Sequence, residues 1–166
     1  MVAKLITDDL TDFEAPLIYW AKTVSGGLKG FFSGKKNKAP VNEDYFLFEF
    51  INTVRRARSS AGYDTITGFW NNSYPAEYIV RLTIYGNASK TRLVQIENSL
   101  FGEEVPRYLA SHGLCFAKVS NIKHSEPFEY TEFLPQSQMD LTFNVTLSSY
   151  EDKGFITQAD ADIEEQ

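Results

Sequence analysis

Apolar residues near the N-terminus recur at alternating spacings of three and four positions, which is typical of one buried face of a helix. They are Leu10, Phe13, Leu17, Trp20 and Val24. The spacing predicts an amphipathic helix over residues 12–25, with Thr11 and Glu14 in capping-box positions and two glycines at its end. The following stretch, residues 26–42, is rich in glycine and lysine and is predicted to be an extended basic loop.

Five later segments have the composition or the alternating pattern of β-strands. They are residues 44–54, 65–70, 77–85, 114–122 and 140–147. The first segment is apolar at nearly every position, so we expect a strand that is covered on both faces. Residues 77–85 and 140–147 alternate between apolar and polar side chains, so each should bury one face. A turn is predicted at residues 71–73.

Two further helices are predicted between the strands. Ser89 is expected to cap the first of them. Its buried stripe consists of Leu93, Ile96 and Leu100. The second covers residues 103–112 and ends at Gly113. The order of elements predicts a single α+β domain over residues 1–166, with a mixed and mainly antiparallel sheet packed against helices, an extended loop, and an acidic C-terminal arm over residues 151–166.

Composition narrows the class of protein. The chain has 166 residues, of which 43% are hydrophobic and 23% are charged, as in folded soluble domains. The net charge of −6 argues against a general nucleic-acid coat protein. No apolar run has the length of a signal peptide or a membrane span, so we expect a product that is cytosolic when made and has no membrane partner. Aromatic residues are abundant, with 13 Phe and 9 Tyr, so the folded chain must place many large flat side chains in its core or at contacts.

Charge is unevenly distributed along the chain. Residues 29–58 carry seven basic and three acidic side chains, whereas the residues after Tyr150 carry six acidic side chains and Lys153. Such separation is typical of subunits that present differently charged faces to one another, although charge alone favours a solvated loop and a solvated tail. Within the loop, Phe31 and Phe32 must either fold back on the core or contact a partner, and folding back is slightly favoured.

Candidate catalytic and metal-binding residues are few. His112 lies at a helix end, where capping is its favoured role, and His124 lies in a polar turn, where a solvated side chain is favoured. Cys115 opens a strand and is expected to be a buried apolar residue rather than a nucleophile. Two histidines without HxxxH spacing and one cysteine are too few ligands for a transition-metal centre. Gly34 and Lys35 lack the other residues of a phosphate-binding P-loop, so we expect no catalytic residue, no metal and no cofactor.

Four segments form a recognisable series. They are YFLF at residues 45–48, YIVRLTIYG at 78–86, the helix with Arg92 to Ile96, and YTEFLPQSQMDLTFNV at 130–145. In this order they resemble the phage neck and tail terminator family of tailed phages and prophages. The last segment is the most specific, because it is similar to that family's pre-strand segment and last core strand. An extended C-terminal piece with Ile163 and Glu164 follows, as in that family, and the resemblance covers about three quarters of the chain.

The resemblance implies a structural α+β protein of the virion, without enzymatic activity, that is assembled in the host bacterial cytoplasm. Such subunits form a ring, usually a hexamer, on the head-proximal end of the tail tube and join the tube to the head–neck connector. The implied partners are other copies of the chain, the tail tube protein, and neck and connector proteins, with the tail sheath as a further candidate. DNA is expected to pass through the lumen without specific binding.

A ring subunit buries large faces against its neighbours, and aromatic residues are enriched at the cores of interfaces. We therefore assign a hypothetical subunit or partner interface to the aromatic pair, the basic residues and the acidic tail. The residues are Phe31, Phe32, Lys35, Lys36, Lys38, Arg55, Arg56, Arg58, Asp160, Asp162, Glu164 and Glu165. When each subunit of a ring presents two different patches, a basic loop that meets an acidic tail is a natural pairing.

Two alternatives remain open from the sequence. Another head–tail connector, such as a head-completion or stopper ring, would share the small α+β design and the logic of assembly. A nucleic-acid-binding module would instead use Arg55, Arg56 and Arg58 together with the aromatic residues, and it should bind DNA with a strong dependence on salt.

Overall fold

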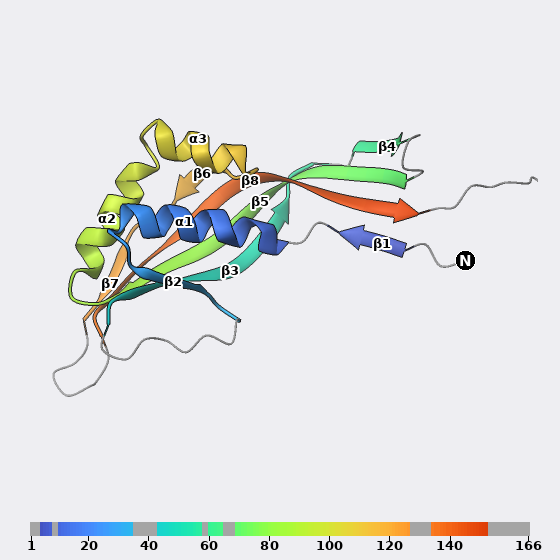
Figure 1. The fold of residues 1–166 in the computed structure, drawn as a ribbon. Coiled ribbons are helices and arrows are strands. Elements are labelled where there is room, and N and C mark those ends of the chain that lie inside the picture. The colour runs from blue at the N-terminus through green and yellow to red at the C-terminus, as the bar shows by residue number, and fades with distance from the viewer. Residues whose placement is uncertain are drawn as a thin grey trace, which may run out of the picture.

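The computed structural model describes residues 4–7, 10–34, 43–57, 60–64, 69–126 and 134–152. Within these ranges the chain forms three α-helices, one 3-10 turn and eight strands (Figure 1). The helices are α1 (Glu14–Val24), α2 (Ser89–Ser99) and α3 (Glu104–Ser111), and the 3-10 turn is Leu10–Phe13. The strands are β1 (Lys4–Thr7), β2 (Lys29–Phe32), β3 (Tyr45–Arg55), β4 (Ser60–Asp64), β5 (Phe69–Tyr85), β6 (Cys115–Val119), β7 (Lys123–Ser125) and β8 (Gln136–Asp152).

All the described strands join one sheet, which is built around two strands of 17 residues, β5 and β8. Neighbours follow the order β1-β8-β5-β3-β2, while β4 also pairs with β5, and both β6 and β7 pair with β8. Among the described pairs, β2 with β3 is parallel and the others are antiparallel. The predicted α+β class with a mixed, mainly antiparallel sheet is therefore confirmed.

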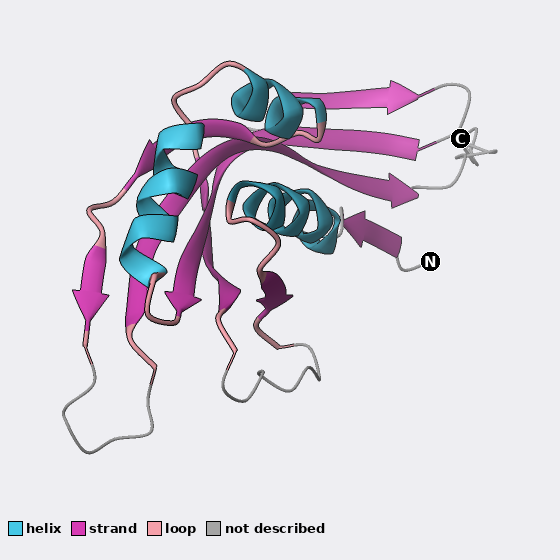
Figure 2. Cartoon of the chain, turned by 60° about the vertical axis from the view of Figure 1, so that its left-hand side comes forward, coloured by secondary structure: helices cyan, strands magenta, loops and turns pink. Residues whose placement is uncertain are grey.

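The three helices cover one face of this sheet, as Figure 2 shows. Alternate residues of the central strands point toward the helices and are buried, because successive side chains of a strand face opposite sides. These residues are Phe46, Phe48, Val80, Leu82, Ile84, Leu141 and Phe143. From the helix layer, the buried Trp20 indole N–H donates a hydrogen bond to Ser99 Oγ at 3.0 Å. This bond satisfies the polar atom of the large ring and ties α1 to the end of α2.

Beyond the helices the sheet continues as a projecting arm (Figure 1). The arm consists of β1, β4 and the adjoining ends of β5 and β8. Here β5 pairs with β4 along one edge and with β8 along the other, and β8 also pairs with β1. The same two long strands therefore belong both to the helix-covered body and to the arm.

Several helix predictions are confirmed. The first helix lies within the predicted residues 12–25 and is followed by Gly26 and Gly27, both with positive φ. The predicted stripe of α2 is buried, and α3 ends before Gly113, whose φ is 81°. His112 caps α3 as expected, since its Nδ1 lies 2.9 Å from the Tyr108 carbonyl oxygen.

The predicted basic loop contains a strand, β2, which is a correction to the sequence-based expectation. Lys29–Phe32 pairs in parallel with residues 45–48 of β3. Gly30 lies directly over the Phe46 ring, where an added Cβ would be 1.9 Å from Cζ. Pairing with a distant strand and close packing on its ring outweigh the local preference for a loop. Residues 35–42, the remainder of the predicted loop, lie outside the described residues.

The region before the long β5 strand also differs from the prediction. A strand at residues 65–70 and a turn at residues 71–73 were expected, but β4 covers Ser60–Asp64 and β5 runs unbroken through residues 71–73. These polar residues pair with β4 on one edge and with β8 on the other, so their backbone groups gain partners that a turn would not provide. Residues 65–68 lie outside the described residues.

Two predictions about single residues are wrong, and a third is wrong in part. The N-cap of α2 is Ala88 rather than Ser89, which instead forms a hydrogen bond with the hydroxyl of Ser137. Cys115 is exposed rather than buried, because β6 lies at the edge of the sheet beside β8. His124 lies in β7 rather than in a turn, although it is exposed as expected, and its Nδ1 contacts the buried Ser137.

Candidate interaction surface

The strand β3 changes character halfway along its length. In its first half Phe46 and Phe48 are buried beneath the helices. From Glu49 onward the side chains are exposed or half-buried, and Phe50 and Ile51 are 44% and 40% exposed. The expectation that this strand would be covered on both faces is therefore wrong, because its apolar run continues past the helix layer.

A β-bulge marks this change. The register between β3 and β5 shifts between Phe50 and Asn52, which leaves Ile51 without an opposite residue in β5. The Phe50 ring stacks on Tyr78 with a centroid separation of 5.5 Å, and Phe13 contacts Tyr78 at 5.2 Å. Burial raises the pKa of the Tyr78 hydroxyl. Phe50 thus covers a buried tyrosine with one side of its ring and leaves much of the rest exposed.

An arginine continues this surface toward the arm. The guanidinium carbon of Arg55 lies 4.4 Å from the centroid of the Tyr74 ring, a cation–π contact. Tyr74 and Tyr78 are separated by an even number of positions in β5, so Arg55 and Phe50 contact side chains of the same face. We call Phe50, Arg55 and Tyr74 the aromatic–arginine patch; the exposed bulge residue Ile51 adjoins Phe50 in β3. Aromatic residues and arginine are the types that dominate binding energy at protein interfaces.

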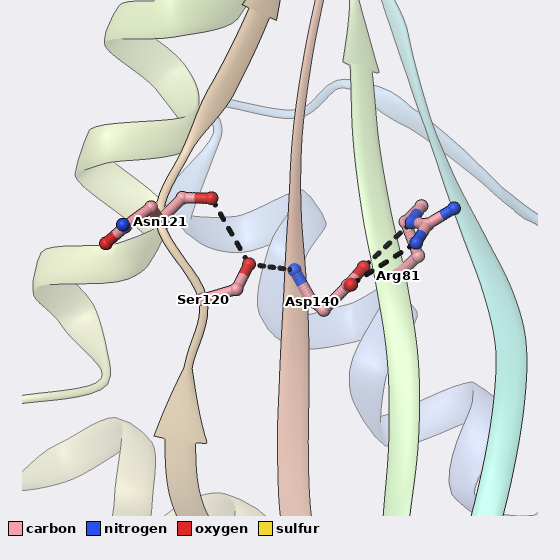
Figure 3. Close-up of polar contacts among 4 residues, drawn as sticks. All are labelled: Arg81, Ser120, Asn121 and Asp140. Carbon is pink, nitrogen blue, oxygen red and sulfur yellow. Dashed lines mark hydrogen bonds and ion pairs between the residues drawn. The ribbon is translucent and has the colours of Figure 1, made fainter.

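The opposite face of the sheet is polar, and no described helix covers it. Arg81 Nε and Nη2 donate hydrogen bonds to the two carboxylate oxygens of Asp140, at 2.8 Å and 3.2 Å (Figure 3). The backbone N–H of Asp140 donates to Ser120 Oγ at 2.8 Å, and that hydroxyl donates to the Asn121 carbonyl at 3.2 Å (Figure 3). The hydrogen bond to Asp140 raises the pKa of Arg81. Glu49 in β3 lies opposite Arg81 in β5, which lies opposite Asp140 in β8, so negative, positive and negative side chains follow one another across the three strands.

Arg56 belongs to this polar face, although it is adjacent to Arg55 in the sequence. Its Nη2 lies 2.5 Å from Glu77 Oε2. The hydrogen bond from Arg56 lowers the pKa of Glu77, and the charges of Arg56 and Lys118 add to that effect. The structure therefore separates the two arginines, with Arg55 over an aromatic ring on one side and Arg56 in an ion pair on the other.

A buried serine pair contacts His124 where β7 meets β8. His124 Nδ1 lies 2.7 Å from Ser137 Oγ, which lies 3.1 Å from Ser89 Oγ, and His124 Nε2 lies 3.5 Å from Glu126 Oε1. These residue types also occur in nucleophile–base pairs, but both serines are fully buried, and a nucleophile must be accessible to its substrate. The cluster therefore serves to fix the N-terminus of α2 against the two strands.

The described residues hold neither a metal cluster nor a membrane-spanning helix. No group of three or more His, Cys, Asp or Glu side chains that could hold a metal ion occurs in this part of the chain. Among the described helices, none is long and apolar enough to cross a membrane.

Four of the interface residues assigned from the sequence are described, and they do not form one site. Phe32 is 3% exposed and stacks on Phe48 at 5.3 Å, so its side chain folds back on the core and offers little surface to a partner. Phe31 is half-buried against Tyr45, with ring centroids 6.2 Å apart. Arg55 and Arg56 lie on opposite faces, as described above. Lys35, Lys36, Lys38, Arg58, Asp160, Asp162, Glu164 and Glu165 lie outside the described residues.

Sequence reasoning missed Phe50, Ile51 and Tyr74 as surface residues. The available signal was the length of the apolar run in β3, which exceeds what one helix layer covers. Exposed aromatic rings also occur on the helix side of the molecule. Phe101, after α2, is 68% exposed and contacts the edge of Phe116 at 5.7 Å.

Comparisons with known proteins give one extensive match. A family model described as "Phage neck terminator protein" matches residues 8–166. Among solved structures, the chain is similar to the sheath/tube terminator of an extracellular contractile injection system, PVC, in its extended state, with a TM-score of 0.49 and 12% sequence identity. That similarity covers 85% of this chain, which spans 57% of the length of the other. No curated protein matches the sequence.

Proposed function

The chain belongs to the phage neck terminator family, and on that basis we propose that it is a ring subunit that caps the tail tube and joins it to the head–neck connector. The family match over residues 8–166 is the observation that carries this conclusion. Membership makes the chain a structural component of the phage tail and neck that associates with other tail components. The proposed role needs neither a catalytic residue nor a cofactor.

Exposed apolar side chains support assembly into a ring. Phe50, Ile51 and Phe101 stay exposed although the same chain buries a full aromatic core. Exposed apolar side chains in contiguous patches, such as the neighbouring Phe50 and Ile51, are typical of protein–protein contacts. In the proposed ring, six copies bury these side chains against neighbouring subunits and against the tail tube, neck or sheath proteins.

The pairing of charges supports a lumen through which DNA passes without specific binding. On the polar face of the sheet, Arg81 is paired with Asp140 and Arg56 with Glu77. Unpaired arginines would bind phosphates and slow the passage of DNA. Paired arginines leave less positive charge to hold the DNA, so we place this face toward the lumen.

The proposed subunit is a single domain that contacts its neighbours through the loop and tail residues expected from the sequence. All 166 residues form one domain whose acidic residues 160–165 and basic residues 35–38 contact neighbouring subunits or proteins. Phe31, Arg55 and Arg58 are assigned to the same contacts, and the buried Phe32 supports them from the core. Arg56, which is paired with Glu77 on the polar face, is reassigned from these contacts to the side that faces the lumen. Assembly takes place in the host bacterial cytoplasm, and the product is carried in the virion.

Native mass spectrometry and negative-stain images of the purified full-length protein test this role. We expect closed rings with the mass of six copies and weak, sequence-independent binding to DNA. A protein that is strictly monomeric and binds DNA with a steep dependence on salt would overturn the terminator role. Deletion of the residues after Gly154 provides a second test, because unchanged rings and unchanged joining to tail tubes would refute the contact role of the tail.

A further inference from the structure

We propose that the acidic C-terminal segment of one copy, residues 160–165, docks on the aromatic–arginine patch of a second copy. The inference rests on the proposed ring and names one of its contacts. It departs from the sequence-based pairing of the tail with the lysine loop, because the described structure offers a surface with both of the features that the tail requires.

The first feature is an apolar surface that the subunit itself does not cover. Phe50 and Ile51 lie at the bulge of β3, just past the helix layer, and both are exposed. The tail sequence is Asp-Ala-Asp-Ile-Glu-Glu, in which Ile163 is the one large apolar side chain. Burying Ile163 against Phe50 and Ile51 would remove apolar surface of both copies from water.

The second feature is a positively charged side chain whose distance from Phe50 matches the spacing of acidic and apolar residues in the tail. Arg55 is exposed, and its guanidinium packs on Tyr74 rather than on a carboxylate in the described structure. The residues opposite Phe50 and Arg55 in β5 are Val80 and Ala76, which places the two ends of the patch about 13 Å apart. An extended peptide rises about 3.3 Å per residue, so a tail docked in extended form would place Asp160 about 10 Å from Ile163, near Arg55.

Charge complementarity favours this occupant over an apolar partner. Residues 160–165 carry four carboxylates and no basic side chain, whereas the patch presents the exposed guanidinium of Arg55. An arginine that already lies flat on an aromatic ring is oriented before binding, so less side-chain entropy is lost when a carboxylate arrives. The family match also extends through residue 166, so the tail is part of what the family shares.

The position of β8 favours docking between copies over docking within one copy. β8 ends at Asp152 in the arm, away from the helices (Figure 1). Glu151 lies opposite Trp70, ten positions along β5 from the partner of Phe50, a separation of about 33 Å. Ile163 follows Glu151 by twelve residues, a reach of at most about 40 Å. A tail would have to run nearly straight along its own sheet to reach its own patch, whereas a neighbouring copy imposes no such constraint.

Disulfide trapping between two full-length variants tests the contact. Both variants carry Cys115→Ser, which removes the exposed native thiol, and then one carries Ile51→Cys and the other Ile163→Cys. After mixing and mild oxidation, we expect a covalent dimer with one copy of each on a non-reducing gel, since a disulfide requires Cβ atoms about 4 Å apart. Replacing Ile51→Cys by Val94→Cys, an exposed position on α2 with a similar exposed fraction of 38%, should give no dimer.

Arginine variants separate specific docking from chance collision. Arg55→Glu in the Ile51→Cys protein should lower the yield of the mixed dimer by about tenfold, whereas Arg107→Glu, on the exposed face of α3, should leave it unchanged.

Three results would overturn the proposal. Cross-linking within the double Ile51→Cys/Ile163→Cys chain without mixed dimers would assign the patch to the chain's own tail. Rings in native mass spectra without a cross-link would refute the docking and leave the ring intact. Absence of both rings and cross-links would refute the proposed function together with this contact.

Discussion

Phe48 and Phe50 lie two positions apart on the same face of β3, yet their surroundings are opposite. Phe48 is fully buried, with Trp20, Phe32 and Phe46 around its ring. Phe50 contacts Tyr78 on one side and is otherwise largely exposed. The helix layer ends between them. The covered region therefore holds the fold of the single chain, and the open region keeps apolar surface available for contacts with other proteins.

The difference shows that residues important for stability and residues important for assembly occupy different stretches of the same strands rather than separate domains. β5 and β8 pass from the body into the arm without interruption, so the arm is anchored by the same backbone hydrogen bonds as the core. Side chains in the covered region should govern stability, and side chains in the open region should govern assembly. The substitutions below test that division, starting with the largest expected effect.

Phe48→Ala should lower the free energy of unfolding by about 3–5 kcal/mol, because it leaves a large cavity in a region that cannot collapse around it. Phe50→Ala should cost about 1 kcal/mol, since much of that ring is already in contact with water. Urea denaturation of both variants, at concentrations where the protein is monomeric, measures the two values. Equal losses would show that the open region contributes to the fold as strongly as the covered one.

Gly30→Ala should destabilise the chain by about 1–3 kcal/mol. The added methyl group would lie 1.9 Å from Phe46 Cζ, so the buried ring and the edge strand would have to move apart. Gly62→Ala is the matched control, because an added Cβ there meets no atom within 4 Å. A Gly30→Ala protein as stable as its Gly62→Ala counterpart in thermal unfolding would mean that β2 is not held tightly against β3.

The covered region was largely predictable from the sequence, because periodic patterns arise from the burial of one face. The 3–4 spacing located α1, and the alternation at residues 140–147 located the core of β8. β2 was missed because its four residues sit among glycines and lysines, and their partner strand begins 13 residues later. Local signals carry no information about such distant pairing.

The open region was predicted less well, for a physical reason. The run from Tyr45 to Ile51 is continuously rich in apolar residues, and no sequence pattern marks the point where the helices stop covering it. The contact between Arg55 and Tyr74 depends on the register between β3 and β5, which a bulge shifts. The sequence indicated the importance of the arginines but could not separate Arg55 from Arg56.

Asp140→Asn should lower the free energy of unfolding by at most about 1 kcal/mol at low salt, and by less at high salt. Both side chains of the Arg81–Asp140 pair remain partly exposed on the polar face, so water weakens their attraction despite the two hydrogen bonds. The matched control is Glu103→Gln, which removes an exposed ion pair with Arg107 on α3 and should have no measurable effect. A loss as large as that of Phe48→Ala would place the polar face among the determinants of the fold.

The smallest effect concerns the two neighbouring arginines. Arg56→Gln should raise the pKa of Glu77 toward its usual value, because the hydrogen bond that stabilises the carboxylate is lost. Since the pKa of Glu77 is lowered in the folded chain, its contribution to stability is present above the unfolded pKa and disappears as the pH falls through the folded pKa. Arg56→Gln should therefore flatten this acidic part of the pH–stability curve.

Arg55→Gln is the control that makes this measurement informative, because Arg55 lies over Tyr74 on the other face of the sheet. An NMR titration of the Glu77 carboxyl carbon should show a raised pKa for Arg56→Gln and no change for Arg55→Gln. Equal shifts in the two variants would mean that both guanidinium groups share the polar face. The surface available to a neighbouring copy would then lose the exposed cation that distinguishes it from the covered half of β3.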